Sequence, residues 1–176
     1  RMRRNKDLKY HKNNLINNQK GLSGKDSVCA KLAVLDDSWT YIRNYTNFNA
    51  CSGDIDGVLI GTRGIFLIEV KNWHGSFRVS GPDMYKHLAN DVYRLYKSPV
   101  DQLSANVQKL KDFLHAHGLE ISPKPLVVLV IGHVESFHGQ TGIFIAGLEN
   151  IVSQILASVD QKISLEQTEK IVNALK

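Results

Sequence analysis

The sequence contains few cysteines and no long apolar run. Its two cysteines, Cys29 and Cys51, form neither a CxxC motif nor a disulfide framework, and unpaired thiols are typical of a reducing compartment. No apolar run reaches the roughly 20 residues that a membrane helix needs, and no apolar segment of signal-peptide type follows the basic N-terminus. We therefore expect a cytoplasmic protein. Because the chain begins at Arg1 rather than at Met, an upstream membrane anchor or further domain stays open.

Positive charge is concentrated at the N-terminus. The first 20 residues hold seven basic side chains and one acid, whereas the rest of the chain holds 15 basic and 16 acidic residues. With 43% hydrophobic residues, the remainder can bury a core. We therefore expect a basic, flexible arm at residues 1–20 and a single domain at residues 21–176.

The arm has three open roles: it could hold nucleic-acid phosphates, contact an anionic membrane surface, or stay solvated. Any membrane contact is expected through the arm alone. The candidate nucleic-acid-binding residues are Arg3, Arg4, Lys6, Lys9, Lys12, Lys20 and, just beyond the arm, Lys25.

Hydrophobic periodicity predicts alternating helices and strands in the domain. Helices are expected at 24–36, 98–117, 147–157 and 164–175, and strands at 39–45, 56–61, 64–71, 125–132 and 142–147, with a short hairpin at 76–86. The histidines at 133 and 138 are expected in a loop. This order predicts an α/β or α+β fold with a mixed four- to five-stranded sheet, flanked by helices and containing one parallel crossover.

Carboxylates interrupt the apolar stretch "GDIDGVLIGTRGIFLIEVKNW" at residues 53–73. Asp56 begins one strand of a predicted hairpin and Glu69 ends the other, so both are expected at one edge of the sheet. Glu69 and Lys71 are two residues apart and share a face of the strand, while Asp54 lies nearer the preceding loop.

Two converging carboxylates repel each other unless a cation lies between them. Mg²⁺ and Mn²⁺ prefer such oxygen ligands, and the bound ion can activate water for phosphoryl chemistry. Lys71 could then orient the water or stabilise charge on the phosphate. The alternative is that Lys71 forms an ordinary ion pair with Glu69 or Asp56 at a strand end.

Three segments in order resemble the nuclease-related domain (NERD) branch of the PD-(D/E)XK nuclease superfamily. "GDIDGVLIGTRGIFLIEVKNWHG" is similar to the family's G-D/E-x-D strand and its ExK hairpin. "SPVDQL" resembles the helix start that brings a glutamine, here Gln102, beside the ExK lysine, and "GLSGKDSVCAKL" resembles the first helix of the family. The resemblance covers about residues 21–131 and implies a restriction-endonuclease-like core.

The resemblance implies a DNA phosphodiester hydrolase that uses Mg²⁺ or Mn²⁺ and leaves a 5′-phosphate. Its catalytic residues would be Asp56, Glu69, Lys71 and Gln102, with Asp56, Glu69 and Asp54 as metal ligands. The expected partner is duplex or branched DNA, with RNA left open, and many superfamily members dimerise to cut both strands.

One position departs from the family pattern. The glutamate of the family's first helix falls on Lys25, and the neighbouring Asp26 is turned by about 100° along a helix. Either the helix is rotated and Asp26 becomes a metal ligand, or the site lacks that acid. The alternatives to a nuclease are therefore a nuclease-like module that binds nucleic acid without cutting it and a membrane-proximal interaction module.

Overall fold

The computed structural model describes residues 23–46, 55–96, 98–138, 142–158 and 162–175. Cys51, Asp54 and the whole basic arm lie outside these residues, so the predictions made for them stay predictions. None of the helices in the described ranges combines the length and the apolar character that crossing a membrane requires.

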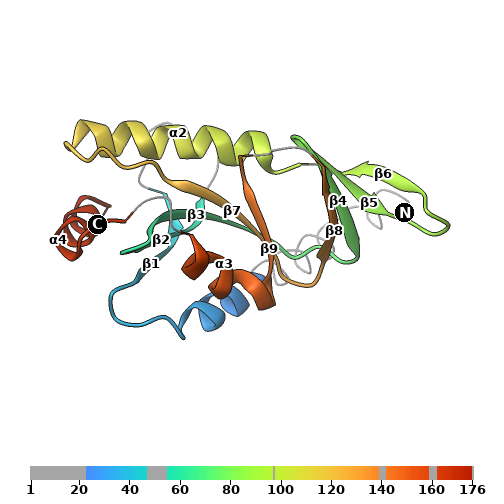
Figure 1. Cartoon of the computed structure of the whole chain (residues 1–176), viewed down its shortest axis with the longest axis horizontal. Helices are drawn as coiled ribbons and strands as arrows, with labels where there is room; N and C mark the ends of the chain where they lie inside the picture. Colours follow the sequence, from blue (N-terminus) through green and yellow to red (C-terminus); the bar gives the residue numbers. More distant parts are fainter. Residues whose placement is uncertain (1–22, 47–54, 97, 139–141, 159–161, 176) are drawn as a thin grey trace, which may run out of the picture.

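A five-stranded mixed sheet forms the centre of the domain (Figure 1). Its order is β1-β2-β3-β7-β9, in which β1, β2 and β3 are antiparallel and the β3–β7 and β7–β9 pairs are parallel. The strands are β1 (Thr40–Tyr45), β2 (Ile55–Gly61), β3 (Gly64–Lys71), β7 (Lys124–Leu129) and β9 (Phe144–Gly147). The mixed sheet and its parallel crossover confirm the predicted fold class.

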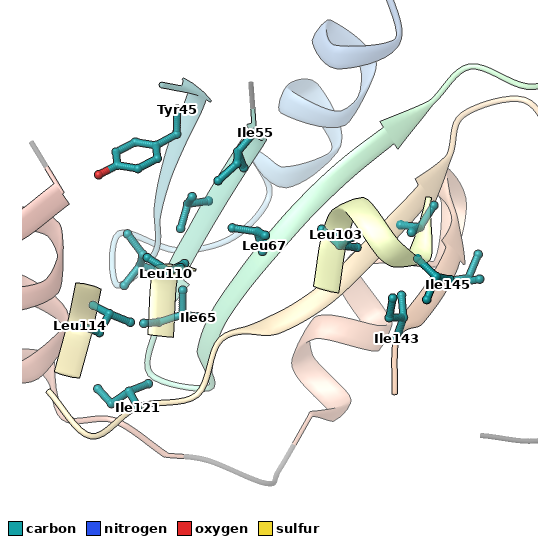
Figure 2. Packing of buried hydrophobic residues seen from close by; sticks show 14 of the residues in the cluster. Tyr45, Ile55, Ile65, Leu67, Leu103, Leu110, Leu114, Ile121, Ile143 and Ile145 are labelled. Carbon is teal, nitrogen blue, oxygen red and sulfur yellow. The ribbon is translucent and has the colours of Figure 1, made fainter. Parts of the chain in front are cut away.

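Helices cover both faces of this sheet. The long α2 (Val100–Ala116) and the C-terminal α4 (Leu165–Leu175) pack on one face, where Leu110, Leu114 and Ile171 are fully buried. Figure 2 shows leucines of α2 beside Ile65 and Leu67 of β3. On the other face, a helix at residues 23–32, termed here the N-terminal helix, packs with the 3₁₀ turn η1 (Leu148–Asn150) and α3 (Ile151–Ala157). The N-terminal helix ends at residue 32, four residues before the predicted end.

A second, four-stranded sheet extends from one end of the first sheet (Figure 1). Its order is β6-β5-β4-β8, with the strands β4 (Ser76–Ser80), β5 (Asp83–His87), β6 (Tyr93–Tyr96) and β8 (His133–His138). The β4–β5 hairpin was expected, but the loop predicted for His133 and His138 is wrong, because these residues form β8. That strand pairs in parallel with β4, which lies more than 50 residues away along the chain, and such distant pairing leaves no local signal.

The two sheets meet at the segment that follows β3. The Trp73 ring packs against Phe77 of β4 and Tyr96 of β6, with ring centroids 5.6 and 4.6 Å apart. Gly132, between β7 and β8, lies so close that a Cβ atom there would come within 2.9 Å of the Trp73 and Gly75 carbonyl oxygens. The backbone after β3 is therefore held tightly between the sheets.

We expect Gly132→Ala to lower the free energy of unfolding by about 1–3 kcal/mol, because backbone must move to admit the methyl group. Gly147→Ala is the matched control, since a Cβ atom there meets nothing within 4 Å and its φ of −71° suits alanine. Urea unfolding of both variants measures the difference, and equal stabilities would contradict this packing.

Candidate active site

The pairing of β2 with β3 brings two carboxylates together at the end of β3. Gly57 stands opposite Ile68 in the antiparallel register, and the next residues outward are Asp56 and Glu69. The Asp56 Oδ2 atom accepts a hydrogen bond of 2.7 Å from the Val70 amide. The predicted convergence of Asp56 and Glu69 is thus a consequence of strand pairing.

Glu69 and Lys71 form a close ion pair. The Lys71 Nζ lies 2.5 Å from Glu69 Oε1, and the Glu69 side chain is only 8% exposed. Burial raises the pKa of Glu69 above its usual value, an effect that Lys71 opposes and that the nearby Asp56 charge reinforces. The ion pair that the sequence offered as an alternative to catalysis is therefore present, within a more extended cluster of charges.

Lys25 completes this cluster from the N-terminal helix. Its Nζ lies 2.7 Å from Asp56 Oδ1 and donates a hydrogen bond of 2.9 Å to Asn44 Oδ1. The Lys25 side chain is 23% exposed and that of Asp56 is 12% exposed. Beside Lys25, the buried Gly24 faces Val70 and Val130, where a Cβ atom would make ordinary contacts of 3.4–3.6 Å. Two carboxylates and two ammonium groups thus lie together at the end of β3, and each carboxylate pairs with one lysine.

Asn44 also contacts this cluster, although no sequence pattern predicted it. It lies in β1 between residues that pair with Gly57 and Ile55, and therefore faces the Asp56 position. Its φ of 47° is left-handed, a conformation that asparagine tolerates better than most residues. An asparagine within a strand was the available signal, since this residue is uncommon there.

Tyr41 of β1 lies over Gly57, where a Cβ atom would come within 2.3 Å of the tyrosine ring. Burial, reinforced by the negative charge of Asp56, raises the pKa of Tyr41 to about 12. Its buried hydroxyl has no hydrogen-bond partner among the described residues. Tyr41 is therefore an uncharged side chain near Asp56, and no sequence pattern predicted it either.

Two other candidates lie apart from the cluster. Asp26 is 66% exposed and pairs with Arg43 at 2.5 Å, so the N-terminal helix presents Lys25 to the sheet and turns Asp26 outward. Gln102 is exposed in the first turn of α2, and no hydrogen bond joins it to Lys71 within the described part of the chain. Lys25, for which nucleic-acid binding stays a prediction, contacts Asp56 and Asn44.

The donor chemistry of the cluster suits a hard divalent cation. Asp56 and Glu69 supply carboxylate oxygens close enough for the Asp56 charge to raise the pKa of Glu69. The described residues contain no group of three or more His, Cys, Asp or Glu side chains arranged to hold a metal. Mg²⁺ commonly uses only one or two protein carboxylates and completes its shell with water and phosphate. Asp56 and Glu69 therefore fit such an ion, with one oxygen of each already contacted by a lysine.

The mixed sheet, with a parallel β3–β7 pair and helices on both faces, is consistent with a nuclease-like core. A family-model comparison matches residues 20–130 to the nuclease-related domain. The chain therefore belongs to the nuclease-related domain family. Searches of curated proteins and of solved structures found no significant match.

We expect Lys71→Met to lower the free energy of unfolding by about 3 kcal/mol, because it leaves the buried Glu69 carboxylate without its partner. The double variant that adds Glu69→Gln to Lys71→Met should recover much of that stability, since a neutral amide is less costly to bury than a carboxylate. Urea unfolding of the two single variants and the double variant measures the coupling. Additive effects of the two substitutions would show that the ion pair contributes nothing.

Proposed function

We propose that the chain is a metal-dependent nuclease that hydrolyses DNA phosphodiester bonds at the Asp56–Glu69–Lys71 cluster. The observation that carries the proposal is the adjacency of Asp56 and Glu69 on paired strands, with the Lys71 ammonium 2.5 Å from Glu69. Membership of the nuclease-related domain family supports the same chemistry.

In this proposal Asp56 and Glu69 hold Mg²⁺ or Mn²⁺. When bound, such an ion makes water more acidic and offsets the negative charge of a phosphate. The Val70 amide fixes the Asp56 carboxylate by binding Oδ2. Glu69 positions Lys71, whose ammonium also lies 5.7 Å from the centre of the Trp73 ring. Lys71 is thereby restrained, and it can donate a hydrogen bond to a phosphate oxygen or to the attacking water.

The proposed reaction is hydrolysis by in-line attack. A water oxygen forms a bond to phosphorus, the bond from phosphorus to the 3′-oxygen breaks, and the products are a 5′-phosphate and a 3′-hydroxyl. The proton lost by the water passes to solvent, and the leaving 3′-oxygen takes up a proton.

Gln102 stays a proposed substrate contact, because α2 presents it to solvent at its N-terminal turn. The exposed position leaves its amide accessible to a phosphate or to DNA.

One observation favours a second candidate function, the binding of nucleic acid without cleavage. Lys25 contacts Asp56 where the family pattern has a glutamate, so the cluster holds as many positive as negative charges. In that case the basic arm would supply binding that weakens steeply with salt. Turnover separates the two candidates.

We expect plasmid or oligonucleotide cleavage with Mn²⁺ or Mg²⁺, abolished by chelator and reduced at least about 100-fold by Glu69→Gln or Lys71→Met. Glu149→Gln is the matched control, because this surface acid is 82% exposed and pairs with Lys31 away from the cluster. Its activity should equal that of the wild-type chain.

Cleavage that survives both Glu69→Gln and Lys71→Met would contradict the proposed site. Salt-dependent binding with no cleavage, under a panel of divalent ions at millimolar concentration, would favour the second candidate instead.

A further inference from the structure

Lys25 is built into the candidate active site rather than exposed beside it. Two acceptors, Asp56 and Asn44, hold its ammonium at 2.7 and 2.9 Å. The orientation of the N-terminal helix is set by the next residue as well, because Asp26 pairs with Arg43 on the outside. A rotation that exchanged the two side chains would break three polar contacts at once.

The contacts of Lys25 overlap with the position that a metal ion needs. Asp56 has two carboxylate oxygens: the Val70 amide binds Oδ2, and Lys25 binds Oδ1. Glu69 already shares one oxygen with Lys71. A divalent cation that used Asp56 Oδ1 would replace the Lys25 ammonium or lie beside it, and two like charges on one oxygen repel strongly at this largely buried carboxylate.

The charge of the cluster points the same way. Asp56 and Glu69 carry two negative charges when ionised, and Lys25 and Lys71 carry two positive charges. A neutral cluster attracts a divalent ion less than one in which a neutral or acidic residue replaces Lys25.

We propose that Lys25 is an intramolecular competitor of the divalent cation at Asp56 and thereby sets the metal requirement of the site. It is a specificity-determining residue: its ammonium occupies the Asp56 oxygen until the ion displaces it, so the chain binds Mg²⁺ or Mn²⁺ weakly by itself. This inference rests on the proposed function in taking Asp56 and Glu69 as the ligands of the ion.

The test is a titration of the full chain with Mn²⁺ alone, in which the free ion is followed by electron paramagnetic resonance. Lys25→Met removes the competing charge without adding a ligand and should lower the Mn²⁺ Kd by about tenfold or more. Lys25→Gln, which keeps a neutral donor toward Asp56 and Asn44, should lower it in the same direction and covers the case in which the methionine variant fails to fold. Circular dichroism melts identify the folded variants.

Two controls make the result specific. Lys31→Met removes another lysine of the N-terminal helix, one that pairs with Glu149, and should leave the Mn²⁺ Kd within about twofold of the wild-type value. Adding Asp56→Asn to Lys25→Met should abolish the gain in affinity, because the freed oxygen loses its charge.

An unchanged Mn²⁺ Kd in a folded Lys25→Met or Lys25→Gln variant would overturn the proposal, as would a gain that survives Asp56→Asn. DNA is absent from the titration, so its outcome is independent of cleavage. Strong wild-type Mn²⁺ binding together with cleavage would leave the proposed nuclease standing and reject the role of Lys25. Tighter Mn²⁺ binding by the Lys25 variants, in a protein that does not cleave DNA, would support the role of Lys25 and reject the proposed nuclease.

Discussion

Two carboxylates on adjacent strands repel each other unless cations accompany them, and this constraint shapes the end of β3. The antiparallel β2–β3 register makes Asp56 and Glu69 neighbours, and Glu69 is largely buried. Lys71 neutralises Glu69 from the same strand, and Lys25 neutralises Asp56 from the N-terminal helix. The cluster is stable because every charge in it has a partner of opposite sign.

The packing of the N-terminal helix and of the two sheets brings these ion pairs together. The N-terminal helix packs against the ends of β3 and β7, where the buried Gly24 faces Val70 and Val130. The second sheet holds the backbone after β3 through Trp73 and through the close approach of Gly132. Lys71 is therefore fixed from both directions: by Glu69 before it and by the packed junction of the two sheets after it.

Local patterns were sufficient to predict the elements that carry the carboxylates and the lysine. The apolar alternation of β2 and β3, the turn between them and the long amphipathic α2 are visible in sequence, and so is the convergence of Asp56 with Glu69. β6 and β8 could not be predicted, since their residues are mostly polar or exposed and their pairing is made by distant segments. Only the β4–β5 hairpin of the second sheet was predicted for that reason.

The orientation of the N-terminal helix was also beyond the sequence. A helix that carries Lys25 and Asp26 side by side could turn either one toward the sheet. The contacts of Lys25 with Asp56 and Asn44, and the outward Asp26–Arg43 pair, select Lys25. Asn44 is itself in the left-handed conformation within β1, and sequence propensity alone does not predict which strand residue adopts it. The carboxylate pair was thus predictable from strand spacing, whereas its second cation was a property of tertiary packing.

The central claim is that Asp56 and Glu69 bind a divalent ion, and that the Lys25 ammonium must leave Asp56 when the ion binds. The most direct measurement is an anomalous difference map of crystals soaked in Mn²⁺. The account predicts a peak about 2.0–2.2 Å from carboxylate oxygens of Asp56 and Glu69, with the Lys25 ammonium moved off Asp56. A peak at that place with Lys25 still bound to Asp56, or no peak there in a protein that cleaves DNA with Mn²⁺, would contradict it.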